Sequence, residues 1–210
     1  MPVSILLAIL LAAVSIAAAV LIAVRTELTR ARGGKILAFL AVFVLPGAAV
    51  WGGTAEQLQR SESTQFCLSC HVMNDFGLSL RVDDPSYIPA VHYQNRLVPR
   101  DAACYTCHTD YTMFGGVHSK FRGLHHLYVQ YLGRVPAPEK VRLYSPYNNR
   151  ECLHCHLGAR PFLEAKAHQR QPGEVAKIIS NQVSCMSSGC HDIVHDIPSL
   201  KSATFWKGPY

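Results

Sequence analysis

The sequence predicts a mainly α-helical protein with much irregular structure, in which two N-terminal transmembrane helices precede a compact second domain. Two observations predict this class. Long apolar segments fill most of the first 55 residues, and all eight cysteines fall in the rest of the chain, in four pairs that each end in a histidine. If each cysteine pair attaches one bound group, the remaining residues, about 155, are too few to build a conventional hydrophobic core around all four groups.

The two apolar segments are expected to form a transmembrane hairpin over residues 1–55. The first, Val3–Val24, carries no charge and exceeds the roughly 20 residues that a membrane-spanning helix needs. The second begins at Ile36 and continues through small residues to about residue 55, and Pro46 with Gly47 predicts a kink within it.

The segment that joins them, residues 25–35, is basic. It contains Arg25, Arg30, Arg32 and Lys35, and only Glu27 opposes them. Because basic loops stay in the cytoplasm, we expect the N-terminus and the second domain to lie outside it. A cleaved signal peptide is the alternative for the first segment, but its positive charges would precede the apolar run, whereas here they follow it.

The cysteine motifs predict covalently attached c-type haem. They are Cys67-Leu68-Ser69-Cys70-His71, Cys104-Tyr105-Thr106-Cys107-His108, Cys152-Leu153-His154-Cys155-His156, and the wider Cys185 to Cys190-His191. In a C-x-x-C-H run, two thiols bind the haem vinyl groups and the histidine becomes an axial ligand of the iron. Four haems and a compact tetrahaem cytochrome domain over residues 56–210 follow from this pattern.

Other uses of these cysteines fit the pattern poorly. A structural zinc site needs two C-x-x-C pairs per metal and gives no reason for a histidine after each pair. A disulfide framework would gain little from cysteines so close together. The fourth motif requires Ser187 and Gly189 to bulge out so that both thiols reach the haem. The net charge of +6 does not indicate nucleic acid, since the carboxylates of four haems can pair with the excess Arg and Lys.

From Trp51 onward the chain resembles the NapC/NirT family of membrane-anchored tetrahaem quinol dehydrogenases, which includes the small subunit of cytochrome c nitrite reductase. The resemblance rests on Trp51-Gly52-Gly53-Thr54, Phe66 to Met73, Val91-His92-Tyr93-Gln94-Asn95-Arg96, Leu127-Tyr128, Leu132-Gly133 and Asn149-Arg150-Glu151-Cys152. It implies a bacterial inner-membrane protein whose haem domain faces the periplasm. Typical members have one anchor helix, so the first helix is a departure from the family.

The resemblance also implies the distal haem ligands, which are His92, His168 and His195. These three serve three of the four haems, and the sequence does not assign them to particular ones. Many relatives carry a further ligand where this chain has Tyr111, and we expect a hydrogen-bonding or packing role for that tyrosine. The first haem differs, because in the family a methionine at the position of Met73 can replace His71 as the axial ligand.

A helix is predicted between the second and third motifs. Its apolar residues recur at three- and four-residue spacing, as Phe114, Val117, Phe121, Leu124, Tyr128 and Tyr131. The other side carries His118, Lys120, Arg122, His125 and His126. Relatives have a quinol-binding lysine at the position of Lys120 and an acidic group near His125 and His126, so these three are the candidate catalytic residues. A solvated polar face is the alternative, and Asp75 and Asp110 are weaker candidates.

The sequence as a whole predicts a cytochrome that transfers electrons from membrane quinol to a periplasmic redox partner, such as a multihaem enzyme. Two alternatives stay open. Electrons could flow from a periplasmic oxidase to quinone, or the protein could be a relay subunit that docks onto other membrane subunits through its extra helix and has no quinone site.

Overall fold

The computed structural model describes residues 3–208 and divides the chain into two units. The anchor unit ends at Ser61, and the cytochrome unit begins at Glu62. The anchor unit contains α1 (Val3–Val24), the short 3₁₀ turn Thr26–Thr29, and a long helix made of α2 (Arg32–Phe39), a π turn (Leu40–Val44) and α3 (Leu45–Arg60). Both predicted apolar helices are present, and each is long and apolar enough to cross a bilayer.

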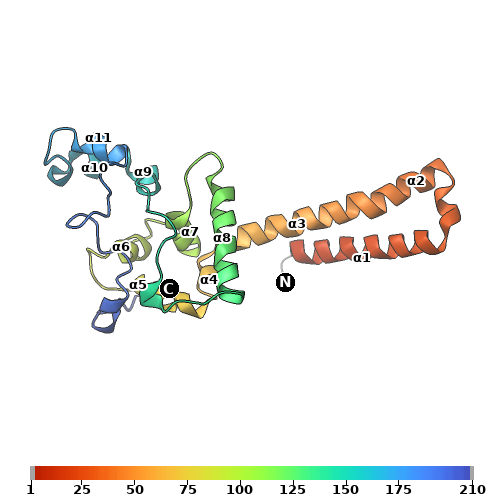
Figure 1. The fold of residues 1–210 in the computed structure, drawn as a ribbon, viewed down its shortest axis with the longest axis horizontal. Coiled ribbons are helices and arrows are strands. Elements are labelled where there is room, and N and C mark those ends of the chain that lie inside the picture. Colours follow the sequence, from red (N-terminus) through yellow and green to blue (C-terminus); the bar gives the residue numbers. More distant parts are fainter. Residues whose placement is uncertain (1–2, 209–210) are drawn as a thin grey trace. The chain divides into compact units, whose positions relative to one another are not determined.

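Small residues hold the two apolar helices together. α1 packs along α3 and the π turn, and the two helices run side by side (Figure 1). The half-buried or buried residues include the small residues Ala8, Ala12, Ser15 and Ala19 on one helix and Ala38, Ala41, Ala49 and Gly53 on the other, together with the larger Ile5, Leu11, Ile22 and Leu45. Small side chains let two membrane helices approach closely. The resulting van der Waals contacts stabilise the pair, because the hydrophobic effect does not drive helices together in lipid. The first helix is therefore an integral part of the anchor unit.

The irregularity predicted at Pro46 takes the form of the π turn that precedes it. Pro46 has no N–H to donate to the carbonyl of Val42, and a wider turn accommodates this missing hydrogen bond. The buried Ser15 hydroxyl donates to the Ala41 carbonyl at 2.6 Å, so a polar group within the π turn is satisfied across the hairpin. The helix then continues to Arg60, past the end expected near residue 55.

The cytochrome unit consists of short helices joined by long irregular segments (Figure 1). Between residues 62 and 208 there is no strand, and one isolated bridge pairs Val82 with Phe205. The α-helices are α4 (Thr64–Cys67), α5 (Asn74–Ser79), α6 (Ile88–Gln94), α7 (Ala103–His108), α8 (Gly115–Tyr131), α9 (Arg150–His156), α10 (Arg160–Glu164) and α11 (Glu174–Ile179). Short 3₁₀ helices cover His71–Met73, Arg100–Ala102, Pro138–Lys140, Lys166–His168 and Pro198–Lys201. The predicted fold class is confirmed.

Two small apolar clusters replace a single core. One joins α6 to the C-terminal segment through Val82, Tyr87, Ala90 and Leu200. The other joins α9, α10 and α11 through Leu153, Phe162 and Ile178. Neither cluster is large enough to hold a domain of this length together. This arrangement agrees with a domain that packs around bound groups.

Candidate haem-binding site

The four cysteine motifs lie on different local structures. α4 ends at Cys67, α7 and α9 carry the second and third motifs whole, and the fourth lies in the irregular segment 185–191. In a helix, cysteines three positions apart share one face, so α7 presents Cys104 and Cys107 together. All eight cysteines are free. Residues 3–208 contain no cluster of three or more His, Cys, Asp or Glu side chains that could hold a metal ion.

Thiols of consecutive motifs lie close to one another. The neighbouring Cys104 thiol is the main cause of a raised pKa at Cys67, and Cys185 has the same effect on the pKa of Cys152. Burial, followed by the charge of the Cys155 thiolate, raises the pKa of Cys107. We number the haem sites by their motifs. Sites one and two, two and three, and three and four are then adjacent, in the order of the chain.

Six histidines form three facing pairs, and each pair joins one motif histidine to one predicted distal ligand. The ring centroids are 6.3 Å apart for His108 with His195, 6.0 Å for His156 with His92, and 6.1 Å for His191 with His168. An imidazole nitrogen lies about 2 Å from a first-row metal that it binds and about 1.1 Å from its own ring centroid. Two imidazoles on opposite sides of one ion therefore have centroids about 6.2 Å apart. All three pairs have the spacing that an iron between two axial histidines requires.

Hydrogen bonds orient the three distal rings. The Nδ1 of His92 bonds to the Ile88 carbonyl at 2.9 Å, and that of His168 bonds to the Phe162 carbonyl at 2.8 Å. A carbonyl can only accept, so each Nδ1 carries the proton and each Nε2 is left with a lone pair for a metal. Such partners fix the tautomer and the ring orientation of a histidine ligand.

The Nδ1 of His195 lies 2.7 Å from the Ser79 hydroxyl oxygen, which is fully buried. Ser79 donates its own proton to the Phe76 carbonyl at 2.6 Å, so the serine oxygen accepts from His195. Burial, and second the nearby His108, lower the pKa of His195 to about 4. The ring is neutral at pH 7, as an axial ligand must be.

The first motif differs from the other three. His71 and Met73 share one 3₁₀ turn, and no histidine ring in the described part of the chain faces His71. With His92, His168 and His195 each paired elsewhere, the first motif is the one without a distal histidine partner.

The model of the NapC/NirT cytochrome c family, N-terminal region, matches residues 29–200 of the chain. The chain belongs to this family. It is thus a membrane-anchored c-type cytochrome with covalently bound haem. The spacing of the three facing histidine pairs fits that group.

The family's curated members are distant relatives of similar length or longer. The cytochrome c-type protein NapC of Escherichia coli K12 is 25% identical over 174 residues, which are 74% of this chain and 79% of NapC. The denitrification system component NirT of Stutzerimonas stutzeri is 27% identical over 173 residues, which are 76% of this chain and 81% of NirT. The cytochrome c-type protein TorC of E. coli K12 is 24% identical over 182 residues, 80% of this chain but 44% of TorC. No solved structure gives a significant match.

The helix predicted between the second and third motifs is α8, and Lys120 lies on its inner side. The Lys120 ammonium is 3.4 Å from Glu62 and 4.3 Å from the ring centroid of Tyr105. The side chain of Lys120 is only 20% exposed. A cation between a carboxylate and an aromatic face is held in one place. The structure therefore places Lys120 between Glu62, which precedes the first motif, and Tyr105, which lies within the second.

His125 and His126 lie further along α8 and share a different neighbour. The ring of Tyr144 contacts both, at centroid distances of 4.6 and 5.0 Å, and its hydroxyl is 3.4 Å from the Nδ1 of His126. Burial, followed by the charge of His125, lowers the pKa of His126, so this ring is neutral at pH 7. Burial, and second the charge of His126, lower the pKa of His108 in the second motif. The structure thus brings His125 and His126 together on Tyr144, whereas Lys120 contacts Glu62 and Tyr105.

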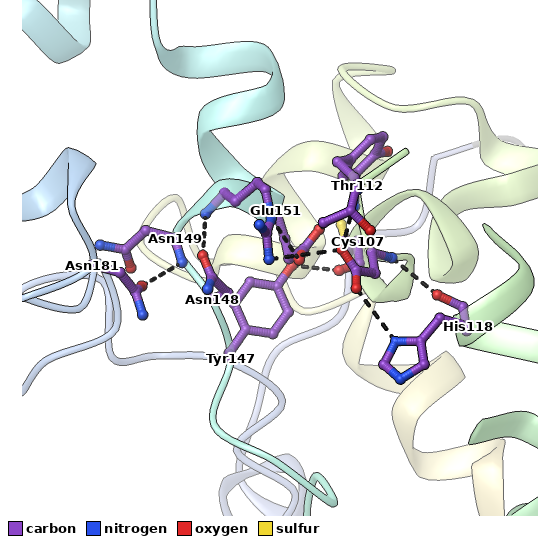
Figure 2. A network of polar contacts seen from close by, with 12 residues as sticks. Cys107, Thr112, His118, Tyr147, Asn148, Asn149, Glu151 and Asn181 are labelled. Carbon is purple, nitrogen blue, oxygen red and sulfur yellow. Dashed lines mark hydrogen bonds and ion pairs between the residues drawn. The ribbon is translucent and has the colours of Figure 1, made fainter. Parts of the chain in front are cut away.

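A polar network connects the second and third motifs (Figure 2). The Tyr147 hydroxyl donates to the Cys107 carbonyl. Asp110 is 3.4 Å from His118 and 3.7 Å from Arg150, and its backbone N–H donates to Ser119. Hydrogen bonds from Thr112 and His118 outweigh partial burial and lower the pKa of Asp110. Asp110 therefore stays charged as part of an internal network, which explains its place in the sequence without a role in quinol chemistry.

Asn149 connects the third and fourth motifs through hydrogen bonds in the same way. Its buried amide donates to the carbonyls of Ile178 and Val183 and accepts from the N–H of Cys185, while its own backbone N–H donates to Asn181 (Figure 2). The Asn149 side chain thus donates two hydrogen bonds from its amide nitrogen and accepts one at its oxygen, all within the protein. The wide fourth motif is thereby fixed to the start of α9.

The role expected for Tyr111 is confirmed. Its hydroxyl donates to the Thr106 carbonyl at 2.8 Å, and its ring stacks on His154 with centroids 3.7 Å apart. His154 is thus a packing partner. Sequence reasoning missed Ser79, Glu62 and Tyr144. A lone serine, glutamate or tyrosine in an irregular segment carries no spacing signal, and only the folded chain shows which histidine or lysine it contacts.

Proposed function

We propose that this cytochrome oxidises membrane quinol and delivers the electrons to a redox partner in the periplasm. The observation that supports the proposal most is the contrast between the sites. Three have a facing pair of histidines, and the first has none and is preceded by Glu62, which pairs with Lys120. A site that differs in its ligands at one end of a row of otherwise similar sites is suited to receive electrons from a donor.

The proposal includes four haems. Cys67, Cys70, Cys104, Cys107, Cys152, Cys155, Cys185 and Cys190 would attach them, and His71 or Met73 would ligate the first. When bound, haem supplies one-electron chemistry, because its iron alternates between two oxidation states. The adjacency of consecutive attachment cysteines supports a continuous row of sites from the first to the fourth.

Lys120 and the histidines of α8 provide what quinol oxidation needs from the protein. Oxidation releases two protons as well as two electrons, so hydrogen-bonding and proton-accepting groups must lie at the site. Lys120, held by Glu62 and Tyr105, would orient a quinol oxygen. His126 is neutral at pH 7 and would accept a proton, and His125 would assist it. The relatives NirT, named as a denitrification component, and NapC agree with a respiratory role.

The proposed orientation places residues 25–35 in the cytoplasm and the cytochrome unit in the periplasm. Arg25, Arg30, Arg32 and Lys35 support it, since a basic loop between two spanning helices is retained in the cytoplasm. A reporter that requires export should be inactive when fused at Gly33 and active when fused after residue 210. Activity at both positions would contradict the two-helix anchor.

The quinol site is tested with Lys120→Ala in the full-length protein. Removing a group that orients or deprotonates the donor typically slows a reaction by a factor of about 10² to 10⁴. Reduction by a quinol analogue should slow strongly, while haem content and reduction by dithionite stay unchanged. Lys140→Ala removes an exposed lysine outside α8 and is the matched control. A normal rate in both Lys120→Ala and His126→Ala would contradict the site and favour the docking role for the protein.

A further inference from the structure

The outer face of α8 exposes a continuous row of large apolar side chains. Phe114 is 72% exposed and Tyr131 77%, at the two ends of the helix. Between them the row consists of Val117, Phe121, Leu124 and Tyr128, which are all more than half exposed. Contiguous apolar surface of this kind marks a place where the protein meets another apolar body.

The orientation of α8 is opposite to that of an ordinary surface helix, which turns its apolar stripe to the core and its charges to water. The inner side of α8 is polar or small. Ser119 accepts a hydrogen bond from the backbone of Asp110, and Lys120 contacts Glu62 and Tyr105. The second cysteine motif therefore meets this inner side, because Tyr105 lies between Cys104 and Cys107.

A salt bridge connects α8 to the first residue of the cytochrome unit. The second spanning helix ends at Arg60, and two residues of extended chain reach at most about 7 Å. Glu62, two residues further along, pairs with Lys120 on α8 at 3.4 Å. The salt bridge therefore ties α8 to the start of the cytochrome unit, two residues after the spanning helix ends.

The charge of α8 agrees with a lipid surface. Gly115–Tyr131 contains Lys120, Arg122 and three histidines but no Asp or Glu, and Arg134 follows shortly after. Basic side chains beside an apolar face that includes Phe and Tyr are typical of helices that lie in the membrane interface. Such helices combine burial of the apolar face with attraction to anionic lipid headgroups.

We propose that α8 is an interfacial helix whose apolar face, from Phe114 to Tyr131, is inserted into the lipid bilayer. The cytochrome unit then has a second membrane contact in addition to the helical hairpin. This inference goes beyond the proposed electron transfer and holds for either direction of electron flow. Its consequence is that the inner side of α8, with Lys120, lies at a fixed depth just above the acyl chains.

Photo-crosslinking in the full-length, haem-loaded protein tests the insertion. The variant Phe121→p-benzoylphenylalanine is reconstituted in nanodiscs that contain anionic lipid. The matched control places the same residue at Arg122, which is also exposed but lies about 100° around the helix. We expect on the order of ten times more lipid adduct at position 121 than at position 122, measured by mass spectrometry of the α8 peptide.

Three outcomes would overturn the proposal. Equal lipid labelling at both positions means that the apolar face is not in the bilayer. A crosslinked dimer means that a second copy of the chain covers it, and a crosslink to another protein in native membranes means that a partner subunit does. If the Phe121 variant fails to load haem, the same substitution at Tyr131, at the exposed end of the helix, gives the same readout.

Discussion

The hydroxyl of Ser79 should set the reduction potential of a single haem, the one at site two. Its oxygen accepts the Nδ1 proton of His195, and such a hydrogen bond makes an imidazole a stronger electron donor to its metal. A stronger donor stabilises the oxidised iron and lowers the potential. Ser79→Ala removes the acceptor, so the potential of this haem should rise.

The size of the shift follows from the hydrogen bond. A neutral hydrogen bond contributes about 1 kcal/mol, and only part of it differs between the two oxidation states. Because 59 mV corresponds to about 1.4 kcal/mol for one electron, the expected rise is roughly 20 to 40 mV. The substitution also leaves a buried N–H unpaired, which should lower the free energy of unfolding by about 1 to 3 kcal/mol.

The assay is a redox titration followed by EPR. The ring planes of His108 and His195 are nearly parallel, at 19°, whereas those of the other two pairs meet at 78° and 63°. Parallel ligand planes split the iron orbitals more, so site two should give a rhombic signal distinct from the others. Ser69→Ala removes an exposed hydroxyl that bonds only to the Phe66 carbonyl and is the control. Unchanged potentials in correctly loaded Ser79→Ala protein would refute the reasoning.

Three further predictions follow from the site. Asn149→Ala leaves the carbonyls of Ile178 and Val183 and the N–H of Cys185 unpaired, so we expect a loss of about 3 to 5 kcal/mol in unfolding free energy and poor loading of the fourth site, measured by denaturation and haem content. Cys190→Ala should lower the pyridine haemochrome ratio from four per chain to three, and a ratio of three in the unaltered protein would contradict the wide fourth motif. Since the pKa of His126 is lowered, its neutral form is lost only as the pH falls below the usual histidine range near 6.5. Quinol-driven reduction should therefore slow toward acid pH, and a His126→Gln variant that keeps the same acid decline would contradict this role.

The helical hairpin and the positions of the motifs could be predicted because their signals are local. An uncharged run such as Val3–Val24 and a C-x-x-C-H motif are both read within a few residues. The form of the π turn before Pro46 depends on packing between helices as well, because the Ser15 hydroxyl that donates to the Ala41 carbonyl comes from another helix. Sequence reasoning gave the place of the irregularity and not its form.

Ligand pairing is a long-range property, which is why the sequence named the distal histidines without assigning them. His195 is far from His108 in the chain, and only the fold brings their rings to 6.3 Å. The amphipathic period of α8 was also read correctly, but periodicity does not say which face is turned inward. The contacts of the half-buried Lys120 with Glu62 and Tyr105 reverse the usual choice.

Reduction of the unaltered protein by quinol tests the central claim most directly. The full-length protein in nanodiscs, with its haem content measured beforehand, is mixed anaerobically with a menaquinol or ubiquinol analogue and followed by stopped-flow absorbance of the haem bands. We predict reduction without any added mediator, to the extent set by the potentials of the haems and the quinol. A protein that is fully loaded and reducible by dithionite, yet not reduced by either quinol, would contradict the account.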